Sequence, residues 1–260
     1  KMQNKFFNLN GKTALITGAA GLLGIEHSKA LLENNCDLVL TDIDLEKLLL
    51  VKKQLENKAL GSNIHIYNMD VSSKSSILNV FNKLEESNIY IDILINNAAL
   101  NPKVEKDNIH KNFSRLETFS LDSWNLEISI GLTGAFLCSQ IFGTAMSKSH
   151  KGGCILNISS DLSVIAPDQR IYKKSNLSEE EQPVKPITYS VIKTGLIGLT
   201  KYLATYWIGK NIRCNSLSPG GIYTSQPDEF REKLSSLIPL GRMANKDEYK
   251  GSILYLLSIN

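Results

Sequence analysis

The sequence predicts an α/β fold with a doubly wound parallel sheet, because short apolar runs alternate with longer segments of helical period along most of the chain. The runs are short and mostly continuous, which is typical of strands buried on both faces. Parallel strands need crossover connections, and the intervening segments have the length and period of crossover helices. We therefore expect one sheet with helices on both of its faces.

Each predicted element follows from this alternation. The strands are expected at 13–17, 37–41, 64–67, 91–96, 154–159 and 212–217. The helices are expected at 22–34, 44–60, 73–87, 121–148 and 189–208. Two long polar loops, 101–120 and 166–187, break the rhythm after strand ends, where ligands bind in open α/β sheets. The architecture expected is Rossmann-type, with both loops near a substrate cleft.

Length and charge limit the class of protein. With 260 residues, 42% of them hydrophobic, the chain can bury one substantial core, and we expect a single domain over residues 1–260. The formal net charge of +3 is spread along the chain instead of gathered in a tail. Such a mild balance disfavours a nucleic-acid partner.

Cysteine usage and hydropathy bear on location. The four cysteines are scattered, form no C-x-x-C pair and mostly lie among apolar residues: Cys36, Cys138, Cys154 and Cys214. This pattern predicts reduced, buried thiols, no metal site and a cytoplasmic protein. No apolar run approaches the roughly 18 residues that a membrane span needs, and residues 1–10 lack the apolar centre of a signal peptide. We therefore expect no membrane association.

A glycine turn follows the first predicted strand. Gly18, Gly21 and Gly24 lie between the strand end at Thr17 and a helix that begins near Leu22. Glycines at this place allow a backbone to approach a pyrophosphate while helix N–H groups point at its charge. The alternative is a tight strand-to-helix turn without a ligand.

Asp42 comes at the end of the second predicted strand. A carboxylate there accepts hydrogen bonds from an adenosine ribose and repels a 2′-phosphate, and neither Thr41 nor Ile43 offers a cation that would reverse this preference. The sequence therefore favours NAD over NADP as the cofactor. The alternative is that Asp42 caps the helix that begins near Asp44.

Tyr189 and Lys193 are four residues apart at the start of a predicted helix, so both lie on one helix face. An ammonium beside a phenol favours the ionised form, and would move a pKa that starts near 10 toward neutrality. A second pair, Tyr206 and Lys210, has the same spacing but lies at the end of that helix, before which no serine-bearing strand ends. We interpret the second pair as an accidental match on the surface.

Taken together, these motifs resemble the short-chain dehydrogenase/reductase family. The resemblance covers the glycine turn, Asn96-Asn97-Ala98-Ala99, Ser160, Tyr189, Lys193 and Pro219-Gly220-Gly221-Ile222-Tyr223-Thr224. It implies that Tyr189 is the general acid/base, that Lys193 binds the nicotinamide ribose and depresses the tyrosine pKa, and that Ser160 holds the substrate oxygen. The activity implied is NAD(P)-dependent interconversion of a hydroxyl and a carbonyl group.

The resemblance also implies a set of cofactor contacts, with Asp70 and Val71 at adenine, Asn96 supporting the central strand, and Ile222 and Thr224 at the nicotinamide carboxamide. The whole predicted set is Gly18, Gly21, Leu22, Leu23, Gly24, Asp42, Asp70, Val71, Asn96, Ala98, Tyr189, Lys193, Pro219, Gly220, Ile222 and Thr224. Alternatives remain: Asp70 could cap a helix, Asn96 could satisfy backbone groups in a turn, and Thr224 could be a loop hydroxyl.

The chain departs from the family pattern in three places. Gly131 stands where the family usually has an asparagine that holds a proton-relay water behind the lysine. Leu22 replaces a usual glycine, and we expect Gly21 to supply the flexible backbone one step earlier. The interval from Ser160 to Tyr189 is longer than usual, which predicts an inserted loop beside the active site.

Both predicted loops carry cations: Lys103, Lys106, Lys111 and Arg115 in the first, and Arg170, Lys173 and Lys174 in the second. They could attract an anionic group, or they could merely keep solvated loops soluble. The glycine spacing and the inserts resemble family members of bacterial surface-sugar pathways. The substrate expected is therefore an alcohol or ketone on a sugar derivative, such as a phosphorylated or nucleotide-linked sugar.

Two other functions remain open. One is a sugar-nucleotide epimerase or dehydratase that recycles bound NAD, and the other is a non-catalytic NAD-binding regulator or scaffold. In relatives, the helices corresponding to 121–148 and 189–208 usually pair between subunits. We therefore expect a homodimer or homotetramer.

Overall fold

The computed structural model describes residues 7–59, 61–100, 114–149 and 151–258. Within them, six parallel strands form one sheet in the order β3-β2-β1-β4-β5-β6. The strands are β1 (Thr13–Thr17), β2 (Asp37–Asp42), β3 (Ile64–Asn68), β4 (Ile93–Asn96), β5 (Gly153–Ile158) and β6 (Ile212–Leu217). The strand order reverses between β1 and β4, where doubly wound folds bind their ligands. The predicted doubly wound parallel sheet is confirmed.

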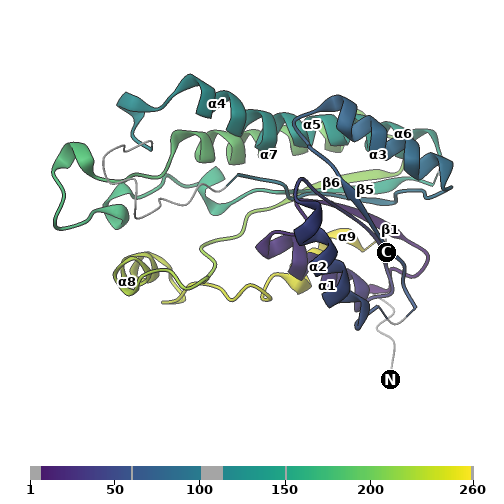
Figure 1. Cartoon of the computed structure of the whole chain (residues 1–260), viewed down its shortest axis with the longest axis horizontal. Helices are drawn as coiled ribbons and strands as arrows, with labels where there is room; N and C mark the ends of the chain where they lie inside the picture. The colour runs from purple at the N-terminus through teal and green to yellow at the C-terminus, as the bar shows by residue number, and fades with distance from the viewer. Residues whose placement is uncertain (1–6, 60, 101–113, 150, 259–260) are drawn as a thin grey trace.

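Helices cover both faces of the sheet (Figure 1). They are α1 (Leu22–Leu32), α2 (Leu45–Glu56), α3 (Lys74–Glu86), α4 (Leu121–Ile128), α5 (Gly134–Cys138), α6 (Thr144–Lys148), α7 (Ile187–Tyr206), α8 (Asp228–Leu237) and α9 (Lys250–Leu257). Figure 1 shows α1, α2 and α9 on one side, α3 to α7 on the other, and α8 apart from both layers.

Alternating side chains of the strands supply two cores. Ala14 and Ile16 of β1 pack in a cluster that includes Leu31 of α1, whereas Leu15 between them packs in a cluster that includes Phe142. All five of these apolar side chains are buried. Because successive residues of a strand point to opposite faces, one short apolar strand serves both layers.

Every predicted strand is present, with ends that differ from the prediction by at most two residues. β4 begins at Ile93 instead of residue 91, since the Asp92 carboxylate accepts hydrogen bonds from Lys12 Nζ and the Thr13 N–H, each at 3.0 Å. Two helices, α8 and α9, were not among the five predicted. Asp228 and Glu229 fill the first turn of α8 after Pro227, which are ordinary signals of a helix start.

The segment predicted as one helix over 121–148 is widened twice by π-helical turns, η3 (Ser129–Thr133) and η4 (Ser139–Gly143). Each turn contains a glycine that faces another helix closely. A Cβ on Gly131 would lie 2.8 Å from Ile192 Cγ2, and a Cβ on Gly143 would meet the indole of Trp207. The widened turns therefore occur where the helix packs tightly against α7 and its end.

This composite helix, Leu121–Lys148, is long and apolar enough to cross a membrane by length and composition, with a mean hydropathy of 1.4 over its most apolar window. The expectation that no apolar run approaches such a length was wrong. In the fold, Cys138, Phe142 and Met146 of this helix are buried in the core beside the sheet. Core helices of soluble proteins have the same composition, so this property alone does not indicate a membrane span.

Candidate active site

The glycine turn joins β1 to α1 through a backbone that leaves no room for a Cβ at Gly18 or Gly24. Gly18 has φ +61°, and a Cβ on it would lie 2.8 Å from Ala98 Cα. A Cβ on Gly24 would lie 2.5 Å from the Gly18 carbonyl oxygen. Both positions therefore need glycine, one for its conformation and both for close packing.

Gly21 does not have the role predicted for it. It is the N-cap residue of α1 with φ −78° and ψ 170°, an extended conformation that any residue can adopt. Gly21 therefore does not supply the backbone flexibility that a glycine at position 22 would give. No side chain caps α1 in the described structure, so the N–H groups near Leu22 and Leu23 have no side-chain acceptor there. Such a helix end is suited to a phosphate group.

Asp42 lies against the glycine turn. Its Oδ2 accepts a hydrogen bond from the Ala20 N–H at 3.0 Å, and its Oδ1 accepts one from the Asp44 N–H at 3.1 Å. The N-cap of α2 is instead Asp44, whose carboxylate accepts from the Lys47 N–H. The alternative that Asp42 caps the following helix was therefore wrong, and the carboxylate stands at the turn itself.

Asn96 and its two successors connect β4 to the neighbouring strands. Asn96 Nδ2 donates to Asn157 Oδ1 at 2.8 Å and to Ser139 Oγ at 3.1 Å, while Asn96 Oδ1 is buried without a partner among the described residues. The alternative that Asn96 serves backbone groups of a turn does not hold, since its amide bonds to side chains. The Ala98 N–H donates to Thr17 Oγ1 at 3.0 Å.

Asn97 is a residue that the sequence interpretation missed. Its Nδ2 donates to the carbonyl oxygens of Thr17 and Gly18 at 3.0 and 2.9 Å, and its N–H donates to Thr17 Oγ1. Asn97 thereby fixes the glycine turn to the end of β4. The signal was present as a second asparagine directly after a buried strand.

Asp70 and Val71 follow β3. Asp70 Oδ1 accepts from the N–H and hydroxyl of Ser72 at 2.9 and 2.7 Å, whereas the cap of α3 is Ser73. The alternative that Asp70 caps a helix was thus wrong, although the carboxylate is used in a local turn. Val71 is buried against Gly134, where a Cβ would lie 2.9 Å from its Cγ2.

Tyr189, Lys193 and Ser160 come together where β5 meets α7. Lys193 Nζ donates to the Ile158 carbonyl at 2.7 Å, and the Lys193 carbonyl accepts from Ser159 Oγ at 2.7 Å, so this turn of α7 is fixed to the end of β5. The Lys193 Nζ is 5.7 Å from the centroid of the Tyr189 ring. Ser160 Oγ donates to Asp161 Oδ1 at 2.8 Å.

Burial dominates the protonation of this group. It raises the pKa of Tyr189, a hydrogen bond with Ser160 lowers it, and the Asp161 carboxylate raises it again. Burial, with help from nearby Lys185, lowers the pKa of Lys193 to about 8. The expectation that Lys193 brings the pKa of Tyr189 below its ordinary value was therefore wrong. The ammonium is 5.7 Å from the ring centroid and donates to a carbonyl, while the phenol loses its hydration.

The segment after β6 lies beside Ser160, because the Asp161 N–H donates to the Pro219 carbonyl at 3.0 Å. The Gly220 N–H donates to Tyr249 Oη at 3.0 Å, and Ile222 pairs with Ala244 in a single β-bridge. Thr224 is exposed, and its N–H donates to Gln226 Oε1.

Gly131 is buried in η3 against Ile192 of α7. Close packing therefore favours the glycine at this position, because Ile192 fills the space that a larger side chain would need.

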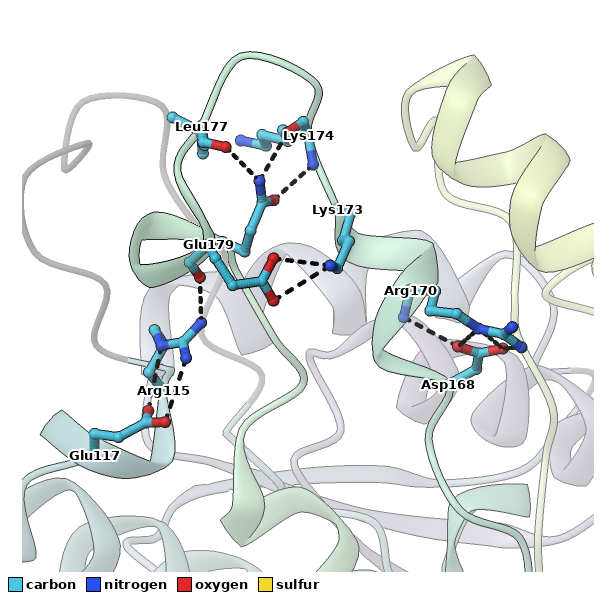
Figure 2. A network of polar contacts seen from close by, with 9 residues as sticks. Arg115, Glu117, Asp168, Arg170, Lys173, Lys174, Leu177 and Glu179 are labelled. Atoms are coloured by element: carbon cyan, nitrogen blue, oxygen red, sulfur yellow. Dashed lines mark hydrogen bonds and ion pairs between the residues drawn. The ribbon is translucent and has the colours of Figure 1, made fainter.

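The insert between Ser160 and α7 is held by exposed polar contacts (Figure 2). Arg170 pairs with Asp168 at 2.6 Å, and Lys173 pairs with Glu179 at 2.9 Å. Arg115, from the other predicted loop, donates to the Glu179 carbonyl at 2.7 Å. These three cations thus already have oxygen partners within the protein. Lys103, Lys106 and Lys111 lie outside the described residues.

The insert also packs on α8. The rings of Tyr172 and Phe230 have centroids 5.4 Å apart, and Lys233 Nζ donates to the Lys173 carbonyl at 2.9 Å. The second pair with the same spacing, Tyr206 and Lys210, lies at the exposed end of α7, where Tyr206 stacks on Tyr202. It takes no part in the group around Tyr189.

Comparison with known proteins assigns the family. A family model described as short chain dehydrogenase matches residues 12–235. The chain belongs to the short-chain dehydrogenase family. Family members are NAD(P)-dependent oxidoreductases that interconvert hydroxyl and carbonyl groups, and the predicted resemblance is confirmed at this level.

Relatives with different substrates match over almost the whole chain. The 3-oxoacyl-(acyl-carrier-protein) reductase of Thermotoga maritima is 30% identical over 96% of this chain and 92% of its own length. The D-arabinitol 2-dehydrogenase (ribulose-forming) of Scheffersomyces stipitis is 29% identical over 97% of this chain and 88% of its own length. A short-chain dehydrogenase from Leptospira borgpetersenii with bound NAD+ superimposes with a TM-score of 0.80, at 28% identity over 99% of this chain and 90% of that one. Other solved structures that resemble this chain contain NADP.

Proposed function

We propose that this protein is an NAD-dependent alcohol dehydrogenase or ketone reductase in which Ser160, Tyr189 and Lys193 carry the chemistry. The observation that carries the proposal is their convergence at the end of β5, next to the switch in strand order. Family membership supplies the reaction class. We further propose that the described residues act as one catalytic domain spanning the single sheet.

The residues around the glycine turn fit a dinucleotide. The space at Gly18 and Gly24 admits no side chain, the amino end of α1 lacks a side-chain cap, and Asp42 stands beside the turn. These features support a pyrophosphate at the turn and a ribose at Asp42. The rest of the proposed cofactor set is Gly21, Leu22, Leu23, Asp70, Val71, Asn96, Ala98, Tyr189, Lys193, Pro219, Gly220, Ile222 and Thr224.

The cofactor preference proposed is NAD. The Asp42 carboxylate repels the 2′-phosphate of NADP, and it is held toward the turn by the Ala20 N–H. Solved relatives contain either coenzyme, so the preference depends on this residue of the chain and not on family membership.

The mechanism divides between bound coenzyme and protein. NAD(P), when bound, would supply the hydride acceptor for oxidation and the hydride donor for reduction. In oxidation, the Tyr189 phenolate takes the proton of the substrate hydroxyl, and in reduction the phenol donates it to the forming alkoxide. Ser160 Oγ fixes the substrate oxygen, for which it must turn away from Asp161. Lys193, which donates to the Ile158 carbonyl, would hold the nicotinamide ribose.

For the substrate, we propose a polyhydroxylated compound such as a sugar derivative. The names of relatives include polyol and sugar-acid dehydrogenases, which support this class, and also a 3-oxoacyl reductase, which shows how widely substrates vary at this identity. A bacterial surface sugar that is phosphorylated or nucleotide-linked is the finer form of the proposal. It depends on the glycine spacing and the insert alone.

A homodimer or homotetramer in the cytoplasm is proposed as the working form. Exposed apolar side chains on the long helix and on α7 support pairing of these helices, among them Leu121, Leu126, Phe136, Tyr202 and Tyr206. The four cysteines are free and buried, which supports a reducing compartment.

A screen of polyols, sugar phosphates and nucleotide sugars with NAD and NADP tests the proposal. Absorbance of the reduced nicotinamide should accumulate with at least one hydroxylated substrate, and faster with NAD. A product formed with only a transient change in this absorbance would indicate an epimerase or dehydratase instead. Coenzyme binding without any conversion would favour a regulator or scaffold.

A further inference from the structure

Lys185 lies closer to the Tyr189 ring than Lys193 does. Its Nζ is 3.6 Å from the ring centroid, whereas the Nζ of Lys193 is 5.7 Å away. Lys185 precedes Pro186, the N-cap residue of α7, so it approaches the phenol from the end of the insert and not from the helix. The ring thus has two ammonium groups near it, supplied by two different segments.

Lys185 differs from Arg170 and Lys173 in having no ion pair, and from the exposed Lys174 in being half-buried. Arg170 and Lys173 are paired with carboxylates on the exposed rim. Among the described residues, by contrast, no oxygen lies within hydrogen-bonding or ion-pair distance of the Lys185 Nζ, although this side chain is half-buried. Its backbone N–H donates to Gln169 Oε1 at 2.8 Å, which fixes the residue in place. The aromatic ring is therefore the main partner of this charge.

We propose that Lys185 is a positioning residue for the reaction: its ammonium, held over the face of Tyr189, acts together with Lys193 to stabilise the phenolate. The proposal rests on the function proposed for Tyr189. A cation over a phenol is attracted to the ring, but it is attracted more strongly to the full negative charge of a phenolate. The contact therefore favours the ionised form that serves as the base.

Several other groups face this pair. The Asp161 carboxylate in η5 (Asp161–Ser163) opposes ionisation of Tyr189 and favours the charged form of Lys185. Glu127 of α4 also favours the charged lysine and accepts a hydrogen bond from Thr188. Burial, Tyr189 and Asp161 raise the pKa of Tyr172 in η6 (Gln169–Tyr172) to about 12, so this neighbour stays protonated near neutrality.

Protonation of the two lysines defines the pH range of the effect. Burial lowers the pKa of Lys185 to about 8, as it does that of Lys193. Both ammonium groups are therefore charged below about pH 8, and the stabilisation of the phenolate weakens as either is neutralised above it. Because the three groups interact, the proton lost in this range belongs to the set and not to one residue.

A spectroscopic titration of Tyr189 tests the role of Lys185 without substrate or coenzyme. The tyrosinate absorbance is followed with pH in the wild type and in Lys185→Met, and each curve is corrected with a partner that also carries Tyr189→Phe. The difference isolates Tyr189 among the nine tyrosines. Lys185→Met should move the low-pH part of this titration, below about pH 8, upward by about one pH unit, because Lys185 is charged there, and should leave the high-pH part unchanged, because Lys185 is neutral there.

Three further variants complete the test. Lys185→Gln repeats the loss of charge with a polar side chain, in case methionine disturbs the fold, and Lys185→Arg should keep the wild-type midpoint. Lys173→Met removes an exposed, paired lysine of the same insert and should also leave the midpoint unchanged. The role of Lys185 is rejected if neither uncharged variant shifts the titration, or if Lys173→Met shifts it equally.

A failure of the role proposed for Lys185 can be distinguished from a failure of the proposed function. If the titration does not move but the KM for substrate rises in Lys185→Met, the lysine contacts substrate and its role toward Tyr189 is rejected. The proposed function fails on other evidence, namely turnover that survives Tyr189→Phe.

Discussion

The glycine-turn region and the insert at residues 166–186 lie at the same edge of the sheet, yet different forces hold them. The turn is fixed by part-buried hydrogen bonds from Asn97 and Ala98 and by glycines that touch neighbouring backbone. The insert is fixed by exposed ion pairs, by one aromatic contact to α8 and by the buried side chain of Gln182, which bonds to the backbone of Lys174 and Leu177. Buried hydrogen bonds resist replacement because a lost partner leaves a polar group unsatisfied, whereas water replaces an exposed pair readily.

The difference between the two regions indicates which of them can vary in ligand specificity. The glycine turn is packed closely against neighbouring backbone, so it can accept one ligand shape. This suits a coenzyme that is shared among relatives. A rim of solvated pairs can change its residues without disturbing the sheet, which suits a substrate that differs between relatives. Tyr189 and Lys185 stand at the boundary, one on the first turn of α7 and the other at the end of the insert.

The largest effect is expected from Tyr189→Phe, which removes the acid/base group and leaves the ring in place. Turnover should fall by about a thousandfold, within the usual contribution of a general acid/base, while NAD binding stays nearly unchanged. Initial rates and coenzyme titrations measure the two effects. Tyr206→Phe, on the exposed end of the same helix, serves as the control and should keep full turnover. Equal loss of binding and turnover in Tyr189→Phe would contradict the assigned role.

Gly24→Ala should damage the turn itself. Its Cβ would lie 2.5 Å from the Gly18 carbonyl oxygen and 2.8 Å from Ala19 Cα, and neither backbone atom can move freely. We expect a loss of about 2 kcal/mol in the free energy of unfolding, together with weaker NAD binding. Gly251→Ala is the matched control, because a Cβ there meets nothing within 4 Å. A similar loss in both variants, measured by denaturant unfolding, would show that close packing is not the cause.

Asp42→Asn should alter the choice of coenzyme more than the fold. The change removes the charge that repels a 2′-phosphate but keeps an oxygen that can accept from the Ala20 N–H. The ratio of NAD to NADP affinity should fall by about tenfold, equal to about 1.4 kcal/mol of discrimination. Fluorescence titrations with both reduced coenzymes measure this ratio. Asp44→Asn, two residues away at the cap of α2, should leave the ratio unchanged.

The smallest effect is expected on the rim. Lys173→Gln breaks the exposed pair with Glu179 and should shift the thermal midpoint little, because water solvates both groups. Lys12→Gln should cost more, since it leaves the nearly buried carboxylate of Asp92 without its ion pair. Melting curves of the two variants give the comparison. A larger loss from Lys173→Gln would mean that the insert is held as firmly as the turn.

The strands and the glycine turn were predictable because their signals are local. Apolar runs place β1 and β2, and Asp42 is the last residue of β2, so its position beside the turn comes from strand order alone. Gly21 was misassigned because a glycine can be required for space instead of conformation. Spacing along the chain does not distinguish these two reasons.

The electrostatics of the site could not be predicted from spacing. The interval between Tyr189 and Lys193 indicates a shared helix face, but it does not reveal that burial outweighs the ammonium in setting the tyrosine pKa. Lys185 is separated from the helix by Pro186, so helical periodicity says nothing about its distance from the ring. Asn97 and the pairs of the insert likewise depend on contacts between distant segments.

The contact between Gly131 and Ile192 carries a consequence for descent. A lone Gly131→Asn exchange would bring its Cβ to 2.8 Å from Ile192 Cγ2, so a larger residue at 131 requires the isoleucine to shift or to be replaced by a smaller side chain. Homologues with a larger residue at this position should therefore carry a smaller one at the position of Ile192.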